Sequence, residues 1–326
     1  MTEMALPERV AVSGGAGFIG SHTVELLVGQ RCRVMVIDDL SHACPWQPPP
    51  GVELVVADCG SEEAARALAN FRPEAVLHLA ARGGVQRARR DPAAHVRAAV
   101  ASTVGFFQSA VAAGARRIVT ASSGGATYGR PPRLPASERM RPAPLSAYGA
   151  SKVAEEVYLA CTGREYGIST MALRYGNVYG ERQDGTGEAG LVAITCNRLV
   201  TGTAPVINGD GQQTRDFIHV SDVAAANLAA LASRRSGVVN VGTGQETSVG
   251  QVVAALVRLA GFPGKPSHAS ALPGEVRRVC LDTARARRWL GWTPRMSLDR
   301  GLRCTFAYFQ SALADSSRFR ELDRCE

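Results

Sequence analysis

The first 123 residues alternate short apolar runs with segments of helical periodicity. β-branched runs such as VAVSG at 10–14 and VELVVAD at 52–58 are separated by helical patterns such as SEEAARALAN at 61–70. The runs are apolar at nearly every position, as in strands of a parallel sheet that helices cover on both faces. Strand and helix patterns alternate at least four times. This alternation predicts successive βαβ units and an α/β fold with a doubly wound parallel sheet.

Beyond residue 176 the pattern loosens into glycine-rich connections between mixed helices. We expect a cofactor-binding domain at 1–176 and a smaller mixed α/β region at 177–316 that binds substrate. Part of the second region is expected to return to the first sheet. A last helix is expected near 298–311, and the polar residues 317–326 are expected to form a tail.

The composition fits a globular protein with a sizeable core, since the chain has 326 residues and 45% hydrophobic content. The formal net charge is +8, but the basic residues are spread along the chain without a nucleic-acid recognition pattern, so no nucleic-acid partner is expected. A leader peptide and a long apolar span are both lacking in the sequence, which predicts a cytoplasmic protein that does not enter the membrane. Eight scattered cysteines without a CxxC pair are expected to be reduced thiols, and no metal is predicted.

Three glycines follow the first apolar run at a spacing of three, namely Gly14, Gly17 and Gly20. Between a strand and a helix, such glycines allow a tight turn, close approach of the backbone to a pyrophosphate, and packing of the helix on the strand. Asp38 ends the next apolar run, where an acid commonly binds the adenosine ribose and favours NAD over NADP. The pattern predicts a Rossmann site for NAD; a plain glycine turn beside a solvated Asp38 is the alternative.

Two further polar residues end apolar runs in this half of the chain. Asp58 either hydrogen-bonds the adenine amino group or caps the helix that follows it. His78 is expected to be a packed histidine rather than a catalytic one.

A tyrosine and a lysine four residues apart, Tyr148 and Lys152, lie in the stretch AYGASK. On a helix this spacing places both side chains on one face. A phenol with a pKa near 10 is a poor base at neutral pH, and a neighbouring ammonium group favours its phenolate form. Because the chain has only seven tyrosines and two lysines, such a pair rarely arises by chance. The pair predicts a tyrosine base that is assisted by a lysine.

Together these motifs resemble the extended short-chain dehydrogenase/reductases, and within them the nucleoside diphosphate sugar 4-epimerases such as UDP-glucose 4-epimerase. The resemblance covers about residues 8–311 and is carried by the Tyr148 and Lys152 pair and by the motifs SGGAGFIGSH, VIDDLS, HLAA, SSGGATYG, LRYGNVYGERQDGTGEAG and GDGQQTRDFIHVSDV. It implies a tightly held NAD, a nucleotide-sugar substrate in the C-terminal region, and a homodimer in which two long helices of each subunit pack together.

On the cofactor side, the resemblance assigns roles to single residues. Tyr148 is implied to be the base on the sugar 4-hydroxyl. Lys152 is implied to be its electrostatic partner and a ligand of the nicotinamide ribose. Phe18, Ile19 and Ala80 are implied contacts of the cofactor beside the three glycines.

On the substrate side, Asn177 is an implied contact of the substrate phosphate, and Arg215 an implied ligand of the diphosphate. Glu275 is implied to contact the nucleotide ribose, and Arg182 is a further expected substrate contact. The alternatives are a solvated ion pair for Arg215 and an ordinary turn for Glu275.

Three positions depart from the family pattern. Gly124 stands where a serine or threonine commonly hydrogen-bonds the 4-oxygen, so either Ser123 takes this role or the role is missing. Ala99 replaces a common asparagine, which puts in doubt a water or backbone link behind Tyr148. Leu272 replaces an arginine, which affects how the base and sugar are held.

The segment after Ser123 also separates reaction types. A 4,6-dehydratase needs a further acid/base pair and a uronic-acid decarboxylase commonly has a glutamate there, whereas this chain has Gly125 and Ala126. Epimerisation at C4 needs only a base and a cofactor that takes and returns hydride. We therefore expect a 4-epimerase of a UDP-hexose, or of a UDP-hexuronic acid if Arg82 or Arg182 receives the carboxylate. A dehydratase or decarboxylase of the same family, or a non-catalytic protein that binds NAD and nucleotide sugars, is the alternative.

Overall fold

The computed structural model describes residues 5–81, 85–186, 190–271 and 275–322. Its elements are, in chain order, β1 (Arg9–Ser13), α1 (Phe18–Gly29), β2 (Arg33–Asp38), β3 (Glu53–Val56), α2 (Glu62–Phe71), β4 (Ala75–His78), α3 (Val85–Arg90), α4 (Pro92–Val96), the π-helical turn η1 (Arg97–Ala101), α5 (Ser102–Ala112), β5 (Arg117–Ser123), α6 (Gly124–Thr127), α7 (Ala147–Tyr166), β6 (Ser169–Tyr175), β7 (Asn177–Tyr179), α8 (Leu191–Val200), β8 (Val206–Asn208), β9 (Thr214–Arg215), β10 (Phe217–His219), α9 (Val220–Ala232), β11 (Gly237–Val241), β12 (Thr247–Ser248), α10 (Val249–Ala260), β13 (Ser267–Ala269), α11 (Ala284–Leu290) and α12 (Leu298–Leu322).

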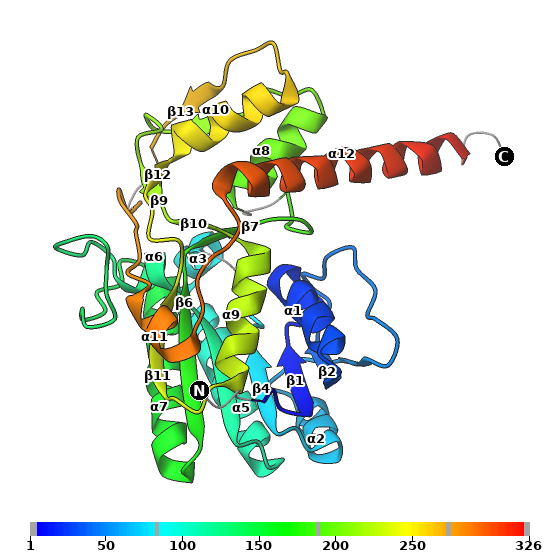
Figure 1. The fold of residues 1–326 in the computed structure, drawn as a ribbon, viewed down its shortest axis with the longest axis vertical. Coiled ribbons are helices and arrows are strands. Elements are labelled where there is room, and N and C mark those ends of the chain that lie inside the picture. The colour runs from blue at the N-terminus through cyan, green and yellow to red at the C-terminus, as the bar shows by residue number, and fades with distance from the viewer. Residues whose placement is uncertain (1–4, 82–84, 187–189, 272–274, 323–326) are drawn as a thin grey trace.

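A seven-stranded parallel sheet forms the centre of the larger region (Figure 1), in the order β11-β6-β5-β4-β1-β2-β3. After β1, the chain adds β2 and then β3 on one side of the sheet. It then adds β4, β5, β6 and β11 in turn on the other side of β1. The reversal lies between β1 and β4, whose carboxyl ends meet at Ser13 and His78. Open α/β sheets bind ligands at such a reversal. The predicted doubly wound parallel sheet is confirmed, and its topology points to one edge as the binding site.

Helices cover both faces of this sheet, and its strands bury side chains on both. Along β1, Val10 and Val12 belong to the core that α1 and α9 share, whereas Ala11 belongs to the core with α2 and α5. Successive strand residues point to opposite faces. The apolar runs are continuous because each face has its own helical layer to pack against.

The second region is smaller and has a separate core, in which α8, α10 and α12 surround Tyr179 and Phe217. Three two-stranded sheets belong to this part of the chain, β10-β7, β12-β9 and β13-β8. Between them the chain returns to the large sheet, where α9 packs beside α1 and β11 pairs with β6. The larger region is therefore completed by residues that follow the first part of the smaller one.

The last helix is longer than the sequence pattern indicates. We expected it to end near residue 311, but α12 continues to Leu322 and extends away from the rest of the molecule (Figure 1). Most of the polar segment 317–326 is thus helical rather than a tail. Arginine, glutamate and leucine all favour helix, so a polar composition alone did not mark the end of the element.

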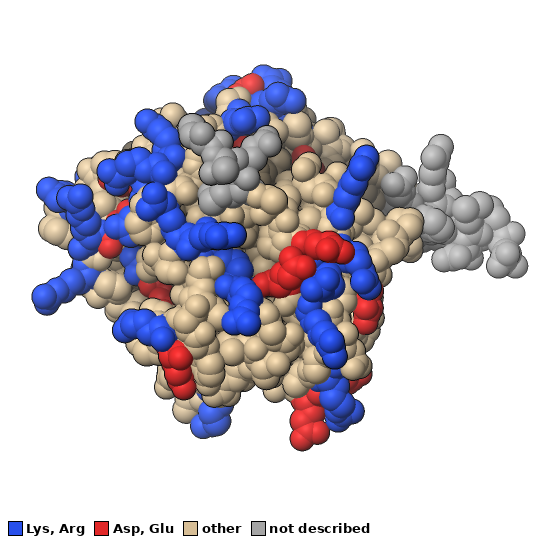
Figure 2. Space-filling model, turned by 60° about the horizontal axis from the view of Figure 1, so that its bottom comes forward, with Lys and Arg blue, Asp and Glu red and all other residues tan. Residues whose placement is uncertain are grey.

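Charged side chains are distributed over the surface. On the face in Figure 2, basic side chains lie over much of the visible surface with acidic ones among them, so this face has no single basic stripe. The absence of a nucleic-acid partner stays a prediction. Across the described ranges, no helix has both the length and the apolar character that a bilayer span requires.

Candidate active site

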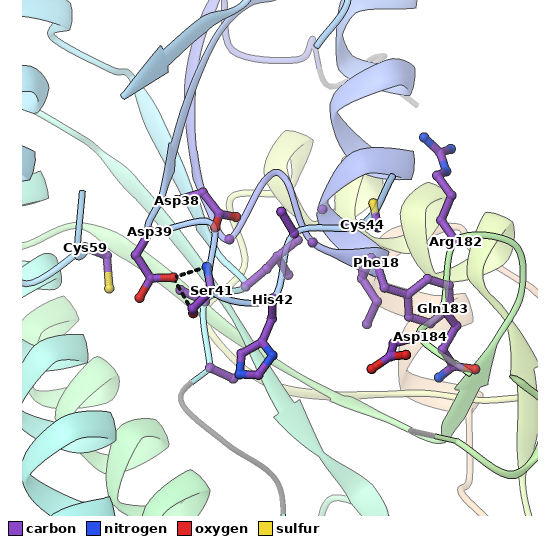
Figure 3. A pocket seen from close by; sticks show the side chains of 18 of the residues that line it. Phe18, Asp38, Asp39, Ser41, His42, Cys44, Cys59, Arg182, Gln183 and Asp184 are labelled. Carbon is purple, nitrogen blue, oxygen red and sulfur yellow. Dashed lines mark hydrogen bonds between the residues drawn. The ribbon is translucent and has the colours of Figure 1, made fainter. Parts of the chain in front are cut away.

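A cavity of about 1170 Å³ opens at the carboxyl ends of the strands, where the sheet changes direction. Its wall combines the loop after β1, the ends of β2 and β3, one face of α7 and one side of α12. Figure 3 shows the part of this wall around Asp38, Ser41 and Cys44. A cavity of this size suits a ligand as long as a dinucleotide.

The loop between β1 and α1 brings its backbone to this wall. Gly14 has a φ of +73°, and a Cβ there would lie 2.5 Å from the backbone nitrogen of Ala80. A Cβ on Gly20 would collide with the carbonyl oxygen of Gly14. Gly17 precedes α1, and no side chain caps this helix terminus, so its first N–H groups can bind an anion. All the residues predicted around this loop line the cavity, namely Gly14, Gly17, Phe18, Ile19, Gly20 and Ala80.

Asp38 ends β2 and is 9% exposed at the cavity wall. Its two carboxylate oxygens accept hydrogen bonds from the backbone N–H groups of Ala16 and Leu40, both at 2.9 Å. Burial raises the pKa of this carboxyl, although the two backbone hydrogen bonds oppose the shift. Asp38 is therefore fixed to the glycine loop rather than solvated, and each oxygen retains a lone pair for a ribose hydroxyl.

Asp58 follows β3 and also lines the cavity. Its Oδ1 atom accepts hydrogen bonds from the Gly60 N–H at 2.7 Å and from the Ser102 hydroxyl at 2.9 Å. The residue that caps α2 is Ser61, whose side chain accepts from the N–H of Ala64. The alternative in which Asp58 caps this helix is therefore wrong.

Tyr148 and Lys152 lie one turn apart on α7, and both line the cavity. Ser146 begins this helix by accepting a hydrogen bond from the N–H of Gly149 at 3.1 Å. The Lys152 ammonium is buried and donates to Glu155 at 2.8 Å. The Tyr148 ring packs against the ring of His95, with the ring centroids 6.4 Å apart. The spacing has thus placed a phenol and a charged amine together at the carboxyl edge of the sheet.

His78 lies beneath the same wall and is 1% exposed. Its Nδ1 atom lies 2.6 Å from the Ser13 hydroxyl, and its Nε2 atom lies 2.9 Å from the Thr103 hydroxyl. Burial lowers the pKa of His78 to about 3, and the charge of Lys152 acts in the same direction. The ring is neutral at pH 7 and joins β1, β4 and α5, which fits the packed histidine that the sequence indicates.

The residues predicted on the substrate side do not line this cavity, namely Ser123, Asn177, Arg215 and Glu275. The Ser123 side chain caps α6 by accepting from the N–H of Ala126 at 3.3 Å. Asn177 is exposed at the start of β7. Arg215 and Glu275 come together as a partly buried ion pair. Arg215 thus forms an ion pair, but it is partly buried rather than solvated, and its partner is the other predicted substrate residue.

Arg182 lines the cavity, yet its charge is already bound. Its guanidinium group donates to both carboxylate oxygens of Glu25 at 2.7 Å, and Trp46 donates to the same carboxylate at 2.8 Å. In Figure 3 the Arg182 guanidinium points away from the residues around Asp38. Arg82, the other arginine considered for a sugar carboxylate, lies outside the described residues.

Two of the three departures from the family pattern can be placed. A Cβ on Gly124 would lie 2.6 Å from the side chain of Leu281, which is fully buried, so this leucine fills the space that a larger residue would need. Ala99 lies in η1 and lines the cavity, where it presents a methyl group. Leu272 lies outside the described residues.

Several polar side chains of the cavity wall were not singled out from the sequence, among them His95, Ser102 and Glu155. Glu155 could have been found, because it follows Lys152 by three residues and shares its helix face. His95 and Ser102 carry no comparable local signal. In the described part of the chain, no group of three His, Cys, Asp or Glu side chains could hold a metal ion.

The wall fits a dinucleotide on three grounds. The glycine loop leaves a backbone cradle that a Cβ would fill, the start of α1 offers N–H groups to a pyrophosphate, and Asp38 offers acceptors to a ribose. These three features meet at the cavity beside the reversal of strand order, which is where α/β sheets bind such ligands.

Comparisons with known proteins agree with this geometry. The UDP-glucose 4-epimerase of Mycolicibacterium smegmatis is 40% identical over 311 residues, which cover 93% of this chain and 99% of that protein. The crystal structure of the Thermotoga maritima UDP-glucose 4-epimerase with UDP-glucose matches with a TM-score of 0.91 at 37% identity and covers 94% of this chain and 99% of that one. The Thermus thermophilus enzyme in complex with NAD matches with a TM-score of 0.87 at 38% identity and covers 93% and 99%.

The sequence profile of one family matches residues 10–242, which include the glycine loop, all of the large sheet except its first residue, and the Tyr148 and Lys152 pair. The cavity, the sheet order and this match lead to one conclusion. The chain belongs to the NAD dependent epimerase/dehydratase family.

Proposed function

We propose that this protein inverts C4 of a nucleoside diphosphate hexose, and that UDP-glucose is the first substrate to test. The observation that carries the proposal is the pairing of Tyr148 with Lys152 at the wall of the cofactor cavity. The relatives from M. smegmatis and T. maritima, which are UDP-glucose 4-epimerases, support the choice of nucleotide and sugar.

Each half of the reaction needs a group that moves one proton. Bound NAD supplies reversible removal of hydride from the sugar C4. Tyr148 takes the proton of the sugar 4-hydroxyl and returns it after the 4-keto sugar has turned over. Lys152, one helical turn away, supplies the positive charge that favours the phenolate. Ser123 directly precedes Gly124 in the sequence, and we assign its hydroxyl the role of binding the 4-oxygen of the sugar.

The cofactor is held by the residues that already face the cavity. The glycine loop and the start of α1 bind its pyrophosphate, and Asp38 binds the adenosine ribose. Asp58, which lines the cavity after β3, accepts a hydrogen bond from the adenine amino group. Substrate binding falls to the region 177–316, through Asn177, Arg215 and Glu275.

The sugar is proposed to be neutral at C6. Because Glu25 binds the Arg182 guanidinium bidentately, this arginine is not free to receive a carboxylate, which disfavours UDP-glucuronic acid. Dehydration and decarboxylation are disfavoured as well, because the described turn Gly124–Thr127 carries no acid.

The test is an incubation of the purified protein with UDP-glucose and no stoichiometric oxidant. We expect a product of identical mass that is inverted at C4, and substrate deuterated at C4 should retain its label. Loss of water would identify a dehydratase, and loss of carbon dioxide from UDP-glucuronic acid would identify a decarboxylase. Binding of NAD and UDP-glucose without turnover would identify a non-catalytic binding protein.

We further propose that the protein is a homodimer that packs through α7. Val157 and Tyr158 are 57% and 49% exposed on this helix, and Cys161 is exposed one turn later. An exposed apolar stripe on a long helix favours a protein partner, and the family resemblance suggests a second copy. Light scattering should give the dimer mass, and Val157→Arg should give the monomer mass.

A cytoplasmic location is also proposed. All seven cysteines in the described ranges are free thiols, as expected in a reducing compartment. Fractionation of the source cells, with detection of the protein in each fraction, tests this location.

A further inference from the structure

Three functional side chains follow one another along the cavity face of α7. Tyr148, Lys152 and Glu155 occupy positions i, i+4 and i+7, and all three line the cavity. The Lys152 Nζ atom lies 2.8 Å from Glu155 Oε2, and the two side chains are 7% and 2% exposed. The residue beyond the lysine is therefore a buried acid in direct contact with it.

The next residue cannot take the place of this acid. Glu156 accepts two hydrogen bonds from the Arg174 guanidinium, at 2.8 and 2.6 Å, and a third from the Ser122 hydroxyl at 2.6 Å. Its charge is thus neutralised by Arg174 on β6. Glu155 is the carboxylate that contacts Lys152, and a buried ammonium group without such a partner is costly.

Within the described residues, ionisable groups face Lys152 from several elements packed around it. On α7 itself these are Tyr148, Glu155 and Glu156. The charge of Lys152 acts on His78 at the end of β4, but this ring is neutral at pH 7. His95 on α4 packs against Tyr148, and Arg90 at the end of α3 lines the same cavity.

Burial and the neighbouring charges shift the pKa of Lys152 in opposite directions. Burial lowers the pKa of Lys152, but the charge of Glu155 is the largest opposing effect, and the pKa of Lys152 is raised overall. Without the Glu155 carboxylate, burial of Lys152 would lose its largest opposing effect.

We propose that Glu155 is a positioning residue of the reaction, which keeps Lys152 charged in the buried cavity and fixes its ammonium group beside Tyr148. One N–H of the ammonium group binds Glu155, and the other two remain for the phenolate and for a ribose hydroxyl. The reactive unit would then have three members rather than two. This inference rests on the roles proposed for Tyr148 and Lys152 above.

The chain offers an internal reference for a direct test, because Lys152 and Lys265 are its only lysines. Protein that is labelled with ¹³C at the lysine ε-carbon should give two signals in an NMR titration. In the wild type, the Lys152 signal should titrate above the ordinary lysine range, and Lys152→Arg assigns it. In Glu155→Gln its midpoint should fall by about one pH unit or more, while the exposed Lys265 signal stays in place.

The matched control is Glu165→Gln, which removes an exposed glutamate from the same helix and should leave both signals unchanged. An unchanged Lys152 midpoint in Glu155→Gln overturns the proposal. If the variant does not fold, the wild-type titration still decides, because a Lys152 midpoint below the ordinary lysine range contradicts it.

Turnover gives the second readout. In Glu155→Gln, kcat for UDP-glucose should fall about tenfold on the alkaline side with KM within about twofold, since loss of the lysine charge affects the base rather than sugar binding. An unchanged kcat across the pH range overturns the positioning role. If the wild type turns over no nucleotide sugar, the proposed function fails, while the lysine titration still tests the Glu155 contact by itself.

Discussion

The two sides of the proposed site are built differently. On the cofactor side, backbone and buried carboxylates face a formed cavity, and Asp38 is held by N–H groups of the loops around it. On the substrate side, Arg215 and Glu275 bind each other, and neither lines the cavity. The cofactor side therefore already presents its groups to a ligand. On the substrate side, Arg215 and Glu275 must give up their contact with each other before they can bind a ligand.

The first prediction concerns Tyr148, where the two sides meet. Tyr148→Phe removes the proton-carrying oxygen and should lower kcat at least about 100-fold, because a positioned base contributes on this scale. NAD affinity and the melting temperature should stay near those of the wild type. Steady-state kinetics with UDP-glucose measure the effect, and nearly normal turnover would place the base elsewhere.

The cofactor side should be intolerant of a single added carbon atom. Gly14→Ala forces a side chain into the left-handed region and against Ala80, so NAD affinity should fall at least about 30-fold, or about 2 kcal/mol. Gly29→Ala is the control, because a Cβ there meets nothing within 4 Å. Calorimetric titration with NAD compares them, and equal affinities would mean that the cradle is not rigid.

The substrate side should respond to loss of charge instead. Arg215→Gln should raise KM for UDP-glucose about tenfold, since hydrogen bonds to charged groups contribute about 1.5–3 kcal/mol, while NAD affinity is unchanged. Arg277→Gln breaks an exposed pair with Asp210 and serves as the control. If both variants keep the wild-type KM, Arg215 is only a structural ion pair.

The remaining prediction concerns Asp38 on the cofactor side. Asp38→Asn keeps the size of the side chain but removes its charge, and it should weaken NAD binding by about 1–3 kcal/mol. NADP should gain relative to NAD, because the charge that repels a 2′-phosphate is lost. Competitive binding of the two dinucleotides measures this ratio, and an unchanged ratio would contradict the ribose contact.

The same contrast explains how much could be predicted from the sequence. The sheet and the cofactor side follow from local patterns, since a strand, a glycine turn and a helix fix the geometry of Gly14 and Gly20 within a few residues. Asp38 could be placed because it ends a strand that lies beside β1. Tyr148 and Lys152 could be paired because helical spacing alone brings them together.

Partners that come from distant segments could not be predicted in this way. Arg182 binds a glutamate 157 residues away in the chain, and Arg215 binds one 60 residues away. The choice among many arginines and acids depends on how the two regions pack. Nor could the sequence pattern show that Leu281 occupies the space beside Gly124, because this contact also joins distant segments.

The return of the chain to the large sheet has a consequence for synthesis on the ribosome. When residue 176 has been made, β6 is an open edge, and the sheet face that α9 will cover is bare. The missing strand ends at Val241, which is 241 − 176 = 65 residues later. At 5–20 residues per second, the nascent chain carries this unfinished edge for roughly 3–13 seconds. Aggregation of newly made protein should therefore be most sensitive to conditions within this interval, and slower translation of the segment 177–241 should lower its yield.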